Sequence, residues 1–83
     1  MIITTIANNK ADSLKLRLID AIVTQMEAKG WSQKEVAVLL NTTQPRISNL
    51  FNYHLEKFSL DTLFKYVYLL DIEVNIDIKI YGE

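Results

Sequence analysis

Apolar residues in the first part of the chain recur at helical spacing, which predicts a helix over residues 12–29. The members of this apolar stripe are Leu14, Leu18, Ile19, Ile22, Val23 and Met26. Gly30 follows the stripe, and glycine readily adopts the left-handed backbone that ends many helices. Leu16 lies off the stripe, so the apolar surface of this helix is wider than one core needs. Either the core wraps around it or a partner covers it.

A capping signal predicts that a second helix begins near Gln33. The hydroxyl of Ser32 can accept a hydrogen bond from the first turn, and Glu35, three residues later, can return one. Trp31, just before the cap, can pack against Val36 as a hydrophobic staple. The start of this helix is therefore marked by a capping box and a hydrophobic staple.

The next stretch, Asn41 to Leu50, reads NTTQPRISNL and has a proline where a helix is expected. Asn41 can end the second helix because asparagine tolerates a left-handed backbone. If Thr43 caps a third helix, Pro45 falls in the first turn, where backbone N–H groups have no intrahelical partner to lose. So tight a link between two helices fixes their crossing angle, and a helix-turn-helix is expected over residues 33–52.

The apolar positions of this segment fit the packing of two crossed helices. Buried side chains are expected at Val36, Leu40, Ile47 and Leu50, with the small Ala37 at the crossing. The segment WSQKEVAVLLNTTQPRISNL resembles the core motif of the lambda-repressor-like, or XRE-type, helix-turn-helix family. The continuation FNYHLEKFSLDTLFKYVYLLDIEVNIDI resembles the HigA-type antitoxin branch, in which a FSLDTL helix and a short strand follow the motif.

This resemblance implies roles for the polar side chains that do not pack. The outer face of the third helix presents Gln44, Pro45, Arg46, Ser48, Asn49 and Asn52. Base contacts in the major groove are implied for Gln44, Arg46 and Asn49, since amides pair with adenine and guanidinium with guanine. Pro45 and Ser48 would add shape contacts to the bases. Phosphate contacts, which fix register, are expected from Gln33, Thr43 and Asn52.

The last third of the chain predicts a fourth helix and then a strand. Ser59 can cap the helix, whose apolar stripe is Leu60, Leu63, Phe64, Val67 and Leu70. The period then changes to two over residues 73–81, which read EVNIDIKIY. The apolar face of this strand consists of Val74, Ile76, Ile78 and Ile80.

A single strand needs a neighbour for its backbone groups. The internal candidate is the short N-terminal MIITTI, and the alternative is the same strand of a second chain, paired antiparallel across a two-fold axis. We favour the second chain, and assign dimerisation to Val74, Ile76, Ile78 and Ile80. A dimer would match two half-sites of an inverted repeat about 34 Å apart on double-stranded DNA.

Composition limits the remaining choices. The chain has 83 residues, no cysteine and a formal net charge of −1, so we expect one small domain over residues 1–83 without disulfides. Residues 29–57 contain four Lys or Arg against two Glu, so the motif is locally positive. We find neither a membrane-length apolar run nor a signal peptide, and expect a cytoplasmic protein that does not bind membranes.

The sequence contains no pattern typical of a metal site or an enzyme active site. His54 is the only histidine and has no carboxylate at a recognisable ligand spacing, so no metal site or cofactor is expected. We find no nucleophile-base pair and no phosphate-cradling loop, and predict no enzyme activity. The tyrosines, Tyr53, Tyr66, Tyr68 and Tyr81, are interpreted as core edge or interface.

The sequence therefore predicts a mainly α protein, a lambda-repressor-like bundle of four to five helices with a C-terminal strand that pairs across a dimer. The favoured function is a sequence-specific DNA-binding regulator, a repressor; the resemblance implies an antitoxin that autoregulates its operon and binds a cognate toxin. One alternative is a protein-interaction module with a structural helix-turn-helix, and another is a phage-type repressor without a toxin. The regulator hypothesis expects Arg46→Ala to remove specific DNA binding while leaving the fold intact.

Overall fold

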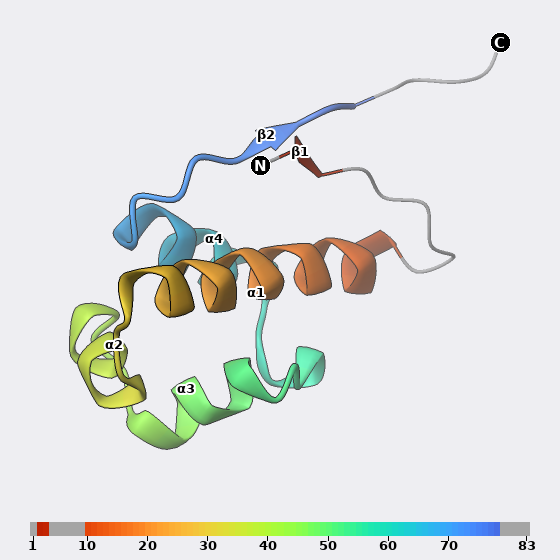
Figure 1. Cartoon of the computed structure of the whole chain (residues 1–83). Helices are drawn as coiled ribbons and strands as arrows, with labels where there is room; N and C mark the ends of the chain where they lie inside the picture. Colours follow the sequence, from red (N-terminus) through yellow and green to blue (C-terminus); the bar gives the residue numbers. More distant parts are fainter. Residues whose placement is uncertain (1, 4–9, 79–83) are drawn as a thin grey trace, which may run out of the picture.

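A computed structural model describes residues 2–3 and 10–78, and these residues contain the four predicted α-helices (Figure 1). The helices are α1 (Lys10–Lys29), α2 (Gln33–Leu39), α3 (Gln44–Phe51) and α4 (Leu60–Leu69). A short 3-10 helix, η1 (Leu55–Lys57), joins α3 to α4, and two short strands are β1 (Ile2–Ile3) and β2 (Asn75–Ile76). The 3-10 helix is the element of this series that the apolar spacing did not predict.

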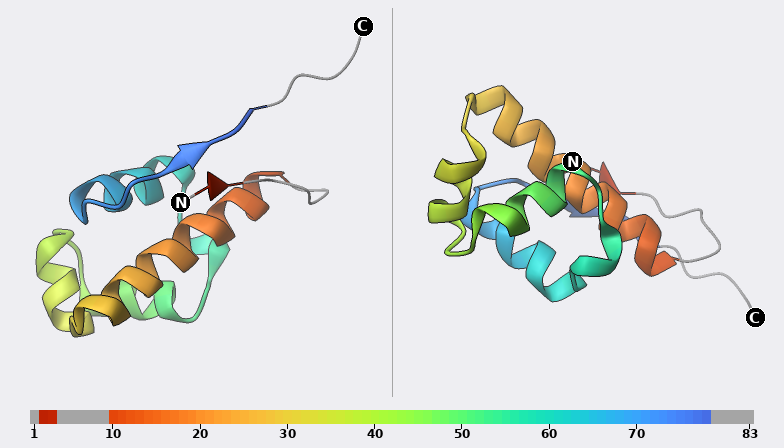
Figure 2. Two further views of the ribbon diagram at one scale, coloured as in Figure 1. Left: turned by 45° about the horizontal axis from the view of Figure 1, so that its top comes forward. Right: turned by 90° about the horizontal axis from the view of Figure 1, so that it is seen from below.

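Helix α1 is the central element of the fold. It crosses the molecule with α3 on one side and the two strands on the other, while α4 packs along it (Figures 1 and 2). Leu18, Ile22 and Met26, four residues apart on one face, are each 0% exposed. Full burial of each such side chain stabilises the fold by about 1.5–3 kcal/mol relative to exposure. The predicted stripe is thus the core face, and Leu16 remains 46% exposed.

The helix-turn-helix forms as its capping residues predict. The Ser32 hydroxyl accepts a hydrogen bond from the Glu35 N–H at 3.0 Å, and the Thr43 hydroxyl accepts one from the Arg46 N–H at 3.4 Å. Pro45 lies in the first turn of α3, so it starts that helix and does not interrupt one. Val36, Ile47 and Leu50 are fully buried, and these positions confirm the expected packing of α2 against α3.

All four α-helices end in the same type of turn. One residue just past the end of each helix has a left-handed backbone: Gly30 (φ 68°), Asn41 (φ 53°), Tyr53 (φ 56°) and Asp71 (φ 54°). At Asn41 the N–H donates to the Val38 carbonyl at 3.1 Å, and the next N–H, of Thr42, donates to the Ala37 carbonyl at 2.9 Å. This pair of bonds is the Schellman motif, which satisfies carbonyls that the helix leaves without partners.

The C-terminal strand has a neighbour in its own chain. Of residues 73–78, only Asn75–Ile76 form a strand, and it pairs in parallel with β1, Ile2 opposite Asn75 and Ile3 opposite Ile76. Residues 79–81 of the predicted strand lie outside the described part of the chain, as do residues 4–9 after β1. Val74 is half-buried, but Ile76 and Ile78 are 48% and 78% exposed, so the expected apolar face is not covered within the chain. Ile80 lies outside the described residues.

Candidate nucleic-acid interface

Helix α3 lies at the surface on the side of α1 away from the strands (Figure 2). Its inner face is fixed by Ile47 and Leu50, both fully buried. Of the six polar-face residues predicted on this helix and its cap, Gln44, Pro45 and Asn52 are exposed, whereas Arg46, Ser48 and Asn49 are half-buried. The structure therefore exposes three of the six predicted residues and partly buries the other three.

Arg46 differs most from the sequence expectation of a free outward side chain. Its guanidinium carbon lies 4.7 Å from the centre of the Phe58 ring, and its Nε–H donates to the Tyr66 hydroxyl at 3.4 Å. Both aromatic residues are buried, and both follow α3 in the sequence, in the η1–α4 region. Arg46→Ala would therefore remove packing as well as a cation, and that this variant leaves the fold intact stays a prediction.

The three residues predicted to hold phosphates lie at helix ends. Gln33 is the first residue of α2 and is half-buried, Thr43 is the N-cap of α3, and Asn52 is its C-cap. The Thr43 hydroxyl oxygen accepts the capping bond, and its O–H remains able to donate to an anion. The capping and phosphate roles of Thr43 are therefore compatible.

A side-chain hydrogen bond ties the turn after α3 to the central helix. The Tyr53 hydroxyl donates to the Asp20 carboxylate of α1 at 2.8 Å, across 33 residues of sequence. Tyr53 is also the left-handed residue that ends α3, a conformation that costs a non-glycine residue about 1–2 kcal/mol. Partial burial, then the hydrogen bond to Asp20, and the negative charges of Asp20 and Glu27 raise the pKa of Tyr53 to about 12.

Charges near the interface are mixed. Lys34 and Lys57 are exposed cations in the motif region, while Glu35 and Glu56 are exposed anions. A hydrogen bond from its own backbone N–H, together with His54 at 3.3 Å, lowers the pKa of the Glu56 carboxyl. Glu56 therefore keeps its negative charge near neutral pH, next to the exposed cation Lys57. Among the described residues no cluster of metal-binding side chains occurs, and no helix is long and apolar enough to cross a membrane.

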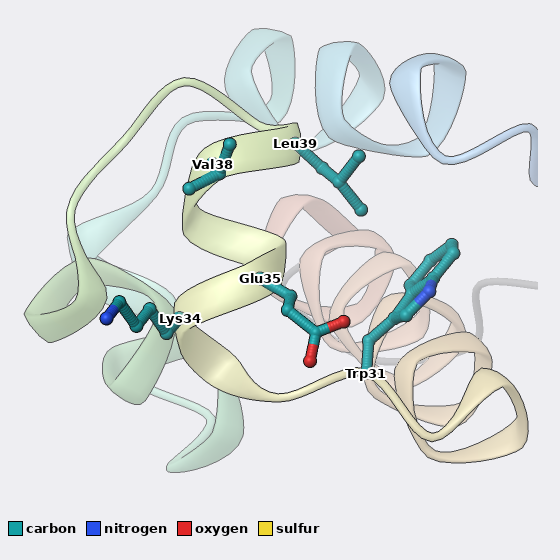
Figure 3. A pocket seen from close by; sticks show the side chains of 5 residues that line it. All are labelled: Trp31, Lys34, Glu35, Val38 and Leu39. Carbon is teal, nitrogen blue, oxygen red and sulfur yellow. The ribbon is translucent and has the colours of Figure 1, made fainter.

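A second surface feature, which was not predicted from the sequence, lies on α2. Trp31, Lys34, Glu35, Val38 and Leu39 line a shallow groove of about 450 Å³ (Figure 3). Val38 and Leu39 are 76% and 49% exposed, although both are strongly apolar. Trp31 lines this groove and also packs against the core cluster that contains Val36, its predicted staple partner. Exposed apolar groups of this kind are typical of surfaces that bind other proteins.

Comparison with known proteins identifies one family. Residues 5–79 match a family described as a helix-turn-helix domain. No curated protein and no solved structure matches the chain.

The Tyr53–Asp20 bond generates a prediction for alkaline solution. Because the folded state raises the pKa of Tyr53 from 10.0 to about 12, the stability that its neutral phenol contributes is fully present below pH 10 and is lost as the pH rises to 12. Near the upper end of this range, Tyr68→Phe should reduce the increase in tyrosinate absorbance, relative to the wild type, by less than Tyr53→Phe does, because Tyr53 carries the raised pKa and Tyr68, 79% exposed, serves as the matched loss of one tyrosine. Equal increases in the two variants would contradict this assignment.

Proposed function

This chain belongs to the helix-turn-helix domain family, and on that premise we propose that it is a sequence-specific DNA-binding transcriptional regulator that reads the major groove with α3. Domains of this family are typically DNA-binding and not enzymatic. The single observation that carries the proposal is the exposed polar surface of α3. That helix is anchored by buried Ile47 and Leu50 and keeps Gln44, Pro45 and Asn52 exposed.

The proposed contacts follow from the chemistry of this surface. Gln44 and Asn49 carry amides suited to adenine, and Arg46 carries the guanidinium suited to guanine or a phosphate. Gln33, Thr43 and Asn52 would bind phosphates on either side and fix the register of α3 in the groove. Pro45 and Ser48 would contact the base edges by shape. Since the whole chain has a net charge of −1, the affinity of one such unit would be weak.

A homodimer would overcome this weakness. We propose that β2, whose second edge is open within the described residues, pairs antiparallel with β2 of a second copy and covers Ile76 and Ile78. Strand β2 and helix α3 lie on opposite sides of α1 (Figure 1). For the two copies of α3 to face the same DNA, the two-fold axis has to run from the strand side of the molecule to the α3 side. Both recognition helices would then face one side of the DNA and match an inverted repeat.

Binding of a dimer to an operator would exclude polymerase, so the proposed regulator acts as a repressor. Resemblance to the HigA-type branch adds the proposal that it is an antitoxin, which represses its own operon and binds a toxin. A phage-type repressor would share the same DNA contacts without a toxin.

The groove on α2 favours a second candidate function. In this alternative the chain is a protein-interaction module that uses Trp31, Val38 and Leu39 to hold a partner such as a toxin, and its helix-turn-helix is only structural. The two functions make opposite demands on α3, because only the regulator needs the side chains of Gln44 and Gln33.

Substituting these two glutamines separates base reading from phosphate binding. Gln44→Ala should lower discrimination between a duplex selected from a random-sequence pool and its scrambled version by about 1–3 kcal/mol, since one base contact is lost. Gln33→Ala should weaken binding to both duplexes equally, by about 0.5–1.5 kcal/mol, since a phosphate carries no sequence information. Fluorescence anisotropy at fixed salt measures both effects.

The matched control is Gln25→Ala on α1, a half-buried glutamine that belongs to neither proposed set of contacts. It should leave both affinities unchanged. Equal affinity of the wild-type protein for the selected and scrambled duplexes, or full discrimination by Gln44→Ala, would contradict the regulator.

The shared-strand dimer predicts that Ile78→Asp gives a monomer. Burying an unpaired carboxylate in the interface is costly, whereas Ile78 is 78% exposed in the single chain, so its replacement should not unfold the domain. Light scattering at micromolar concentration should show the mass of two chains for the wild type and of one chain for the variant. Val38→Asp, at a position 76% exposed on α2, is the control and should remain dimeric. A monomeric wild type with a folded spectrum would remove this model.

A further inference from the structure

Arg46 is held from two directions by residues outside the helix-turn-helix motif. Its guanidinium lies over the Phe58 ring, with Cζ 4.7 Å from the ring centre, inside the range of about 6 Å for a cation–π contact. Its Nε–H donates to the Tyr66 hydroxyl at 3.4 Å. These contacts restrain a side chain that would otherwise sample many rotamers.

The two aromatic residues are themselves fixed. Phe58 is 2% exposed and Tyr66 is 4% exposed, and their rings meet edge to face with centres 6.4 Å apart. Tyr66 lies on α4, which packs on the central helix α1, and this packing fixes the position of its hydroxyl. The position of the guanidinium is therefore set by the core and not only by α3.

The geometry points to Tyr66 and Phe58 as positioning residues for DNA recognition: they orient Arg46 so that its terminal Nη groups make a paired hydrogen bond to DNA. This inference rests on the proposed function. The Tyr66 hydroxyl uses the Nε–H, and the Nη edge keeps two parallel N–H donors, the arrangement that suits two acceptor atoms side by side. Guanine O6 and N7 offer such a pair, and so do two phosphate oxygens. Because the side chain is ordered before DNA arrives, binding loses less conformational entropy.

The decisive variant is Tyr66→Phe, which keeps the ring that packs on Phe58 and removes only the hydroxyl. Without the hydroxyl, the Arg46 side chain has to be ordered on binding, and the cost of ordering one such side chain predicts that affinity for the selected duplex falls about three- to tenfold. The matched control is Tyr68→Phe, the same chemical change two residues along α4 at a position 79% exposed, which should have no effect. Thermal unfolding of each variant checks that the fold is retained.

A second background separates positioning from simple stabilisation. Arg46→Met keeps an unbranched stem against Phe58 but has no donor groups. If Tyr66 acts through Arg46, adding Tyr66→Phe to this background should not reduce DNA affinity further. A purely structural role of Tyr66 would reduce affinity by the same factor in both backgrounds, and that result would overturn the inference, as would unchanged affinity of Tyr66→Phe alone.

Two further readouts complete the test. In the DNA-free protein, the Arg46 Nε–H signal in an NMR spectrum should be resolved in the wild type and lost to solvent exchange in Tyr66→Phe. An unchanged signal would overturn the inference even if that variant bound DNA poorly for other reasons.

The DNA affinities of Tyr66→Phe show which group Arg46 contacts. A loss of affinity confined to the selected duplex would assign the contact to a base, whereas an equal loss for both duplexes, with a salt slope lower by about one, would assign it to a phosphate. Failure of the wild type itself to discriminate between duplexes would overturn both this inference and the proposed function.

Discussion

Each of the four α-helices ends in a residue with a left-handed backbone, and the turn at that residue sets the direction of the element that follows. Gly30 turns the chain from α1 into α2, Asn41 turns it into α3, and Tyr53 turns it into η1. In each case two backbone hydrogen bonds close the turn, so little freedom remains in the short connections. The angle between α2 and α3, on which the exposure of α3 depends, follows from this constraint.

Anchoring of α3 at both ends connects the fold to recognition. At its N-terminal end, Thr43 caps the helix and Arg46 is held by Phe58 and Tyr66. At its C-terminal end, Tyr53 bonds to Asp20 of α1. The outer surface between these anchors is thus presented by a helix that is fixed to the core, which is what a site that reads base edges requires.

Local signals allowed most of this architecture to be predicted from the sequence. Apolar spacing gave the four helices, the Ser32 and Thr43 caps gave the starts of α2 and α3, and Asn41 gave the turn between them. Three features depend on contacts between distant residues and could not be predicted in this way. These are the left-handed Tyr53, the tethered Arg46 and the parallel pairing of β2 with β1, at the other end of the chain. The α2 groove was missed because an exposed Val38 or Leu39 looks like a core residue in a sequence.

Amide chemical shifts would show whether α3 is the surface that contacts DNA. A ¹⁵N-labelled sample titrated with a duplex selected from a random pool would show which backbone groups respond. We expect the largest changes over residues 43–52 and at the start of α2, while Val38 and Leu39 change little. Changes concentrated at Val38 and Leu39, with residues 43–52 unaffected, would contradict this expectation and identify the α2 groove as the binding surface.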